Sequence, residues 1–270
     1  EWMAAFLDKE PDSRKEKAIG VAKSMGFKIE PLNVNTSGKV WEISGDGKTL
    51  IQPLTSIKGL GDSAMDQILM HRPFDVVEDF LFHEEIVYSK LNKKALDVLC
   101  RSGALSPLQD DRFTGAKHFW SAVACDRPRK PKDLLDNIET YSEEGDFSIE
   151  ERVQYLTDLT GIFPINLVMK DTIRKQLDQY AVPAISEYDP DLNVVWFIPR
   201  KVNIRKTKND KTYYVLEVID SNNVVTQIRC WGVRPEKDHI QVNRPYMAKL
   251  DYNTQWGFST RSIHHNFRAL

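Results

Sequence analysis

Few cysteines and the lack of a long apolar run narrow the classes of protein to which this sequence can belong. The 270 residues include three cysteines, Cys100, Cys125 and Cys230, which form no CxxC pair and no cysteine–histidine cluster with zinc-finger spacing. This usage predicts a reducing, cytoplasmic environment and no structural metal. No segment approaches the roughly 18 consecutive apolar residues that a membrane-spanning helix needs, so we expect no contact with a membrane.

Recognisable catalytic motifs are also lacking. The sequence has no Walker phosphate-binding loop, and its acidic pairs, such as Glu84-Glu85 and Glu143-Glu144, fall in predicted helices or loops without convergent partners. We therefore predict no catalytic residue, no metal ligand and no cofactor in this chain. Because the sequence starts at Glu1 and residues 1–7 already follow a helical apolar pattern, we expect it to be a piece of a longer protein.

Charge is distributed unevenly along the chain. The formal net charge is -2, yet residues 193–270 contain 13 lysines and arginines against 6 aspartates and glutamates. The remaining residues contain 24 basic side chains against 33 acidic ones. A basic block on an otherwise acidic protein indicates a local site for a polyanion and argues against a globally basic binder.

A glycine hairpin between two short apolar helices is the most informative segment. Gly59-Leu60-Gly61 allows close backbone approach, and free amides there and in the first turn of the next helix would face a phosphate. In the alternative interpretation the glycines merely permit a sharp turn, and the nearby Asp62 and Asp66 count against phosphate binding. The predicted contact residues are Lys58, Gly59, Leu60, Gly61 and Ser63.

A second candidate contact begins at Asn92, which is suited to cap a helix. Lys93 and Lys94 then fall in the first helical turn, where a cation is unfavourable by a few tenths of a kcal/mol. Their position is explained if an anion docks there. The alternative is that both lysines are simply solvated.

Five segments with period-two alternation follow residue 193 and predict a small Greek-key barrel of the oligonucleotide-binding (OB) type: 194–206, 211–220, 224–231, 245–252 and 257–263. Strand parity places Val202 and Ile204 inward. The outward set combines cations with an aromatic ring, which suits single-stranded nucleic acid, although a solvated edge that prevents aggregation remains an alternative. That set is Lys201, Arg205, Tyr213 and Arg229, and Lys206, Lys208 and Lys211 are expected around the tip of the hairpin between the first two strands.

The order of these parts resembles the C-terminal half of the alpha-subunit family of bacterial and phage DNA polymerase III, the C-family replicative polymerases. Five segments carry the resemblance: 1–7; 22–35; the hairpin 57–61; 91–94 with 102–105; and 159–165. The sequence departs from the family at Ile162-Phe163, where the family has a histidine before Pro164. The family's clamp-binding peptide is not found, and Gln176-Leu177-Asp178-Gln179-Tyr180 is only a partial imitation inside a predicted helix.

The resemblance implies a multidomain α+β fold. Its expected parts are the end of the polymerase fingers (1–51), a helical helix-hairpin-helix DNA-binding domain (52–126), a linker and helical connector (127–192) and a five-stranded OB-type barrel (193–270). It also implies the function of the DNA-binding portion of a DNA-directed DNA polymerase, a nucleotidyltransferase. The helix-hairpin-helix would contact duplex backbone, and the barrel would contact single-stranded template.

The same resemblance places the palm carboxylates, and the Mg²⁺ expected for the intact polymerase, outside this chain, so the fragment alone is expected to be inactive. Its expected partners are DNA and the rest of the polymerase, in the cytoplasm of a bacterium or a phage-infected host. Two alternatives stay open: a non-enzymatic DNA-binding accessory factor, and a protein-docking module built on an OB fold.

Overall fold

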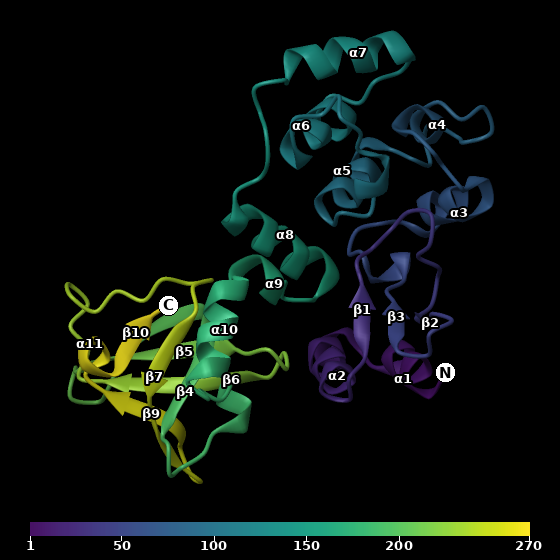
Figure 1. The fold of residues 1–270 in the computed structure, drawn as a ribbon. Coiled ribbons are helices and arrows are strands. Elements are labelled where there is room, and N and C mark those ends of the chain that lie inside the picture. The colour runs from purple at the N-terminus through teal and green to yellow at the C-terminus, as the bar shows by residue number, and fades with distance from the viewer. The chain divides into compact units, whose positions relative to one another are not determined.

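The computed structural model describes the backbone of residues 1–270 and all side chains except those of Asp12 and Ser13. The chain divides into two compact units, Glu1–Phe163 and Pro164–Leu270. Figure 1 shows that the first is largely helical and that the second is built on a sheet. None of the described helices combines the length and apolar character needed to cross a lipid bilayer. The finer division into four parts stays a prediction.

The first unit opens with two helices that share an apolar core with a small sheet. The sheet has the order β1-β3-β2, with β1 parallel and β2 antiparallel to β3. β2 and β3 therefore form a hairpin. Met3, Leu7, Ile19, Trp41 and Leu50 form the core. The elements are α1 (Trp2–Lys9), α2 (Asp12–Ser24), β1 (Lys28–Glu30), β2 (Glu42–Ile43) and β3 (Thr49–Ile51).

A second, larger core lies among the helices that follow. It is formed by fully buried side chains such as Leu54, Ile68, Phe80 and Leu96. The elements around it are η1 (Leu54–Ser56), α3 (Asp62–His71), α4 (Val77–Leu81), α5 (Lys93–Arg101), η2 (Ser106–Leu108), α6 (Ala116–Trp120), the π-helical turn η3 (Ser121–Cys125), α7 (Pro131–Thr140) and α8 (Ile149–Thr160).

A close contact between two backbone segments precedes the start of α6 at Ala116. The chain at Gly115 touches the backbone of Gly145 so closely that a Cβ on Gly115 would lie 2.4 Å from the Gly145 carbonyl carbon. The Gly145 oxygen accepts hydrogen bonds from the amides of Lys117 (3.1 Å) and His118 (3.0 Å). The loop between α7 and α8 therefore fixes the start of α6.

The second unit places helices α9 (Ile165–Val168) and α10 (Asp171–Gln179) and the turn η4 (Ile185–Glu187) before one mixed sheet of seven strands, in the order β10-β7-β4-β5-β6-β9-β8. The five predicted strands are all present, but the fourth is divided at Leu250, and a short last strand is added. A five-stranded barrel is therefore not confirmed. The strands are β4 (Val194–Lys206), β5 (Thr212–Ile219), β6 (Val225–Trp231), β7 (Tyr246–Lys249), β8 (Asp251–Asn253), β9 (Gly257–Arg261) and, after α11 (Ile263–Asn266), β10 (Phe267–Ala269).

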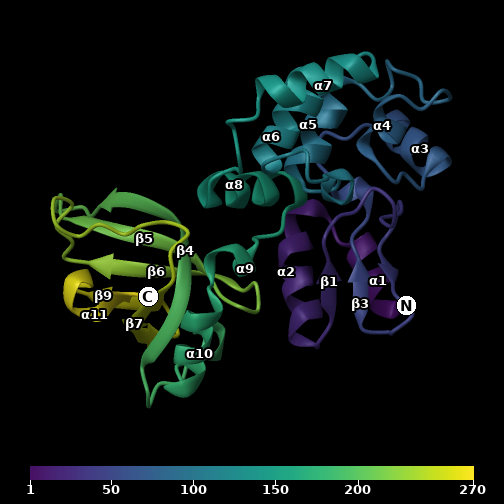
Figure 2. The same ribbon diagram turned by 45° about the horizontal axis from the view of Figure 1, so that its top comes forward.

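Strand β4 bends, and its two halves pair with strands in two different parts of this sheet. Its first half pairs with β7, its second half pairs with β5, and the register shifts between Pro199 and Lys201. In Figure 2 the long β4 curves beside β5 and β6. Strand β6 then pairs in parallel with β9, which pairs with β8. The inner face is filled by Val195, Phe197, Leu216, Ile228, Leu250 and their neighbours.

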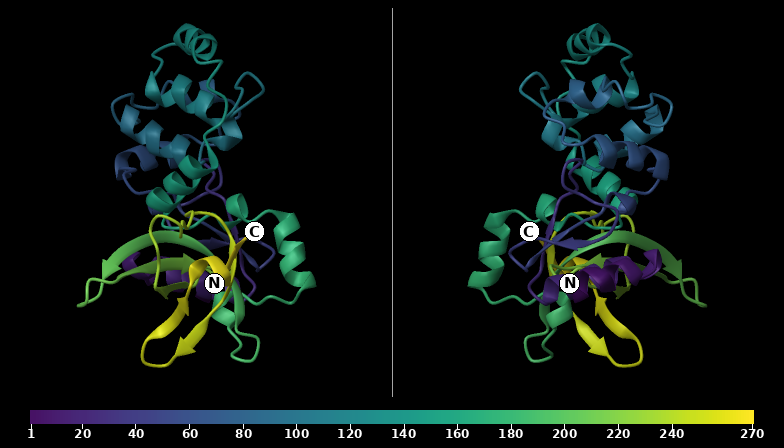
Figure 3. Two further views of the ribbon diagram at one scale, coloured as in Figure 1. Left: turned by 90° about the vertical axis from the view of Figure 1, so that its left-hand side faces the viewer. Right: turned by 90° about the vertical axis from the view of Figure 1, so that its right-hand side faces the viewer.

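Two hairpins project from the curled sheet as separate arms. Figure 3 shows the green β4–β5 hairpin and the yellow β8–β9 hairpin extending in different directions. One prediction about the first arm is wrong: Ile204, expected to face inward, is 63% exposed. Ile204 lies opposite the buried Tyr214, but this part of β4 pairs with β5 alone and forms the edge of the sheet. A side chain on the inward-facing side of the strand is therefore not buried at that position.

Candidate nucleic-acid interface

The glycine hairpin adopts a conformation that requires glycine at one position only. Gly59 has a φ of +90°, whereas Gly61 has an ordinary φ of -78° and is the N-cap of α3. Leu60 is half-buried against the larger core, as predicted. Gly61 has no side chain that could cap the helix, and its carbonyl oxygen accepts from the amides of Ala64 (3.0 Å) and Met65 (3.1 Å), so the amides left for an anion at the start of α3 are those of Asp62 and Ser63.

The hairpin amides are not all free, contrary to the expectation from sequence. The Lys58 amide donates to the Leu159 carbonyl oxygen (2.8 Å), and the Leu60 amide donates to the Ile57 carbonyl oxygen (3.1 Å). The first bond attaches the hairpin to the end of α8. The groups that could still bind an anion here are the first turn of α3 and the exposed side chain of Lys58.

The structure brings the two predicted phosphate contacts together. A Cβ on Gly59 would stand 3.6 Å from the Lys94 Cε atom and 3.6 Å from a Val98 methyl group, so the hairpin rests on α5. Asn92 caps this helix as predicted, since its Oδ1 accepts from the Ala95 amide at 3.0 Å. Lys93 and Lys94 are exposed in the first turn, which contains no acidic side chain.

The acidic neighbours of the hairpin differ in how far they oppose an anion. Asp66 forms an ion pair with Lys39 (Oδ1–Nζ 2.5 Å), a residue that sequence analysis did not single out. The hydrogen bond to Asp66 raises the pKa of the Lys39 ammonium, and the ammonium charge offsets the Asp66 carboxylate. Asp62 is exposed in the first turn of α3, where its charge is favourable to the helix but unfavourable to a bound phosphate.

On the second unit, the outer face of the sheet carries a row of two aromatic rings with a cation on either side. Arg205 is the cross-strand partner of Tyr213, and Trp231 is the partner of Arg261. The rings of Tyr213 and Trp231 stack, with centroids 4.6 Å apart and planes inclined by 24°. The row Arg205–Tyr213–Trp231–Arg261 therefore crosses four strands. Arg261 was missed from the sequence, although alternation in the last predicted strand would have placed it outward.

A parallel row contains the other predicted arginine. Val215 pairs with Asn203 on one side and with Arg229 on the other, and Arg229 pairs with Ser259. The Arg229 guanidinium donates to the Trp256 carbonyl oxygen in the β8–β9 arm. The indole of Trp256 is 60% exposed, so it adds a ring beside this face that sequence analysis did not consider.

The remaining predicted lysines do not all join this face. Lys201 is exposed and lies opposite Glu217, which offsets part of its charge. Lys206 falls on the opposite side of the strand and pairs with Asp210 (2.8 Å). Lys208 and Lys211 are exposed near the tip of the β4–β5 arm. The structure thus gathers Lys201, Arg205, Tyr213 and Arg229 on the outer face, and Lys206, Lys208 and Lys211 lie around the hairpin tip, as expected from the sequence.

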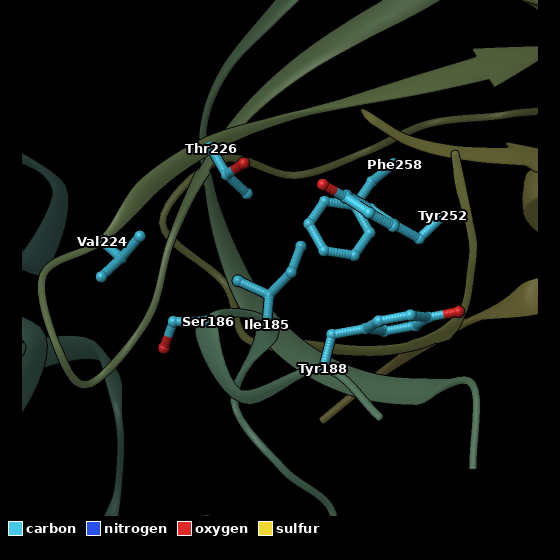
Figure 4. A pocket seen from close by; sticks show the side chains of 7 residues that line it. All are labelled: Ile185, Ser186, Tyr188, Val224, Thr226, Tyr252 and Phe258. Carbon is cyan, nitrogen blue, oxygen red and sulfur yellow. The ribbon is translucent and has the colours of Figure 1, made fainter. Parts of the chain in front are cut away.

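An apolar pocket of about 290 Å³ opens on the other side of β9. Phe258 in its wall pairs with the core residue Ile228, whereas the next residue, Ser259, belongs to the outer face. Figure 4 shows the rings of Tyr188, Tyr252 and Phe258 gathered together, with Val224 across the opening. Nearby in the core, burial raises the pKa of the Cys230 thiol to about 12, which marks it as an inert packing residue.

Comparison with known proteins agrees with this geometry. Residues 26–115, which include the hairpin and the Lys93–Lys94 turn, match a family model described as a helix-hairpin-helix motif. The DNA polymerase III subunit alpha of Chlamydia muridarum is 26% identical over 180 residues, which is 64% of this chain and 12% of that protein. The chain resembles part of the DNA polymerase III alpha subunit. The resemblance seen in the sequence is thus confirmed.

Two further alpha subunits extend the comparison. That of Xylella fastidiosa (strain Temecula1) is 30% identical over 119 residues, or 42% of this chain and 10% of the relative. That of Aquifex aeolicus is 24% identical over 260 residues, or 92% of this chain and 21% of the relative. The chain therefore spans between about a tenth and a fifth of the length of the alpha subunits it matches.

Proposed function

We propose that this chain is the DNA-binding C-terminal portion of a replicative DNA polymerase alpha subunit. It grips the backbone of duplex DNA with the helix-hairpin-helix and single-stranded template with the sheet of the second unit. The observation that carries the proposal is the contact of Lys94 with the Gly59 hairpin, inside the segment that matches the helix-hairpin-helix model. That contact joins the α3 amides and the α5 lysines in one anion-binding surface.

Binding of duplex through this surface is independent of sequence. Backbone amides and lysine ammonium groups are ligands for phosphate oxygens, and such contacts orient a protein on DNA without reading base edges. Two helix N-termini, of α3 and α5, add the favourable end of their dipoles to the lysine charges. Asp62 reduces the local potential, so we expect moderate affinity that falls steeply with salt.

The sheet of the second unit is best described as an OB-type barrel with one interrupted strand. β7 and β8 are separated by Leu250 alone; β7 pairs with β4, and β8 pairs with β9. If the two are counted as a single strand, the pairing returns from β9 to β4 and closes a five-stranded ring. The antiparallel β4–β5–β6 meander and the parallel β6–β9 pair support this interpretation, with β10 as an added edge strand.

The outer face of this barrel suits single-stranded DNA. Stacked rings offer a platform for bases, and arginines on both sides of the platform can hold consecutive phosphates. The Tyr213–Trp231 stack between Arg205 and Arg261 provides both. Fluorescence anisotropy of the chain with a single-stranded oligonucleotide tests the proposal: we expect binding that weakens with salt, and salt-insensitive or absent binding would contradict it.

The catalytic carboxylates and their Mg²⁺ belong, in this proposal, to the rest of the polymerase, which is a DNA-directed nucleotidyltransferase of the bacterial or phage-infected cytoplasm. The chain alone should not extend a primer in the presence of Mg²⁺ and nucleotides, and robust template-dependent synthesis would overturn this part. A sliding clamp is not assigned as a partner here. The partial clamp-binding sequence lies in α10 and at its end, where Leu177 is 5% exposed and unavailable to a groove.

One observation favours the docking module as a second candidate function. The pocket between Tyr188 and Val224 is apolar, and Tyr252 at its rim is 52% exposed, which is suited to an apolar side chain of a protein partner. If Tyr252→Ser abolishes association with the remaining polymerase while oligonucleotide binding persists, both functions hold. If the chain binds the polymerase but no oligonucleotide, docking is the function. An adjoining palm-encoding sequence would exclude the accessory-factor alternative.

A further inference from the structure

Two histidines and a glutamate that are separate in sequence meet beside the end of α3. One ligand atom from each of His71, His83 and Glu85 lies within 4.8 Å of the others. We propose that these residues form a binding site for a divalent transition metal of the zinc class. The site is in the helical part of the first unit and does not depend on the proposed function.

The distances suit metal coordination. The Nδ1 atom of His71 and the Oε2 atom of Glu85 are 3.3 Å apart. Two ligands that each lie about 2.0–2.1 Å from a tetrahedral Zn²⁺ are separated by roughly 3.4 Å, so this pair already has the required spacing. The His71 and His83 rings are 4.8 Å apart at their centroids and inclined by 41°, so neither ring blocks the other.

The Nδ1 lone pair of His83 forms only a weak hydrogen bond. Its Nδ1 accepts a hydrogen bond from the Glu85 amide at 3.3 Å, which is long for an N–H donor. A nitrogen that accepts a hydrogen bond carries the lone pair that a metal ion requires. Binding of a metal ion would therefore replace one weak hydrogen bond by a coordinate bond.

The surroundings hold two of the ligands and leave the third adjustable. The His71 side chain is 9% exposed, and one turn earlier on α3 Gln67 accepts the Val87 amide at 2.7 Å, which fastens the loop that carries His83 and Glu85. The Phe74 ring meets the His83 ring edge-on at 6.4 Å. Glu85 is 76% exposed, so it can close on an ion from the solvent side, and water can supply a fourth ligand.

The donor set selects the class of metal. Two imidazole nitrogens and one carboxylate oxygen suit Zn²⁺, Co²⁺, Ni²⁺ or Cu²⁺, whereas Mg²⁺ prefers a complete set of oxygen ligands. A metal here would fasten the loop after α4 to α3 and stabilise the segment that leads to the Asn92 cap.

The experiment is calorimetric titration of the whole, chelator-treated chain with ZnCl₂, with MgCl₂ in parallel and Cys125→Ser as the background so that the exposed thiol does not contribute. We expect one Zn²⁺ per chain, no measurable Mg²⁺ binding, and a higher Tm with zinc. Outer-shell partners alone are worth roughly 10- to 100-fold in metal affinity, so Glu85→Gln and His83→Ala should each weaken binding by about tenfold or more.

Glu85→Gln changes an exposed side chain, so it separates loss of a ligand from loss of fold, and circular dichroism should be unchanged. The matched control is His264→Ala, which removes a histidine in the other unit and should leave zinc binding intact. The proposal is overturned if zinc does not bind, or if Glu85→Gln and His83→Ala bind it as tightly as the background chain.

Discussion

Lys94 lies against the glycine hairpin, with its Cε atom 3.6 Å from the position that a Cβ on Gly59 would occupy. Neither segment alone distinguishes a DNA contact from an ordinary turn or a solvated lysine. Their contact supports the proposed duplex-binding surface, because it concentrates two helix N-termini and several cations at one place on the surface. Substitutions can separate the contribution of this arrangement to folding from its contribution to DNA binding.

The two glycines of the hairpin should respond differently to alanine. Gly59→Ala forces a side chain into a φ of +90° and should lower the free energy of unfolding by about 1–2 kcal/mol. Gly61→Ala places a methyl group in open space at an ordinary φ and should change the free energy of unfolding by less than about 0.5 kcal/mol. Urea unfolding measures both, and equal losses would contradict the assigned roles.

Replacing Lys93 and Lys94 by alanine should weaken duplex binding and leave the fold intact. Each lost phosphate contact should reduce the slope of log affinity against log salt by roughly 0.9. Because cations at a helix N-terminus are unfavourable, stability should stay the same or rise by a few tenths of a kcal/mol. The control is Lys48→Ala in the β2–β3 turn, and an identical salt slope for both variants would refute the contact.

Loss of the aromatic platform should weaken binding of single-stranded DNA. Stacking on an aromatic side chain is worth about 1–3 kcal/mol per base, so Trp231→Ala should raise the Kd roughly 5- to 150-fold. Tyr252→Ala removes an exposed ring from the pocket side of the barrel and serves as the matched control. If the control weakens binding as much as Trp231→Ala, the assigned face is wrong.

An arginine cluster in the first unit should make stability depend on acid pH. Arg112 donates to Glu78 (2.6 and 3.0 Å) and to Asp110 (2.7 Å), and these bonds lower the pKa of both carboxyl groups. Lowered folded-state pKa values favour the charged form, so the contribution is present above the unfolded-state pKa of about 4 and disappears as pH falls through the folded-state values.

Arg112→Gln should therefore lower the urea midpoint at pH 7 and bring it closer to the wild-type value near pH 3. The pairs are partly exposed, so the effect should be modest. Lys130→Gln, which removes a cation that lies 3.9 Å from Asp133, is the control for a general change of charge. A difference from wild type that does not diminish at low pH would contradict this explanation.

Local features of the chain were predictable, and contacts between distant segments were not. Asn92 and Gly103 mark the beginning and end of α5 as capping chemistry requires, and period-two alternation located every long strand of the second unit. In contrast, Arg261 faces Trp231 only because β9 pairs in parallel with β6, and the Lys58 amide is occupied only because Leu159 lies beside it. No local pattern encodes such pairs.

One crossed measurement tests whether the chain has two separate DNA-binding surfaces with different preferences. Anisotropy titrations would compare Lys93→Ala/Lys94→Ala with Tyr213→Ala/Trp231→Ala, each against a duplex and a single-stranded oligonucleotide at fixed salt. We expect the first variant to lose affinity mainly for the duplex and the second mainly for the single strand. Unchanged affinity of both variants for both DNAs would contradict it.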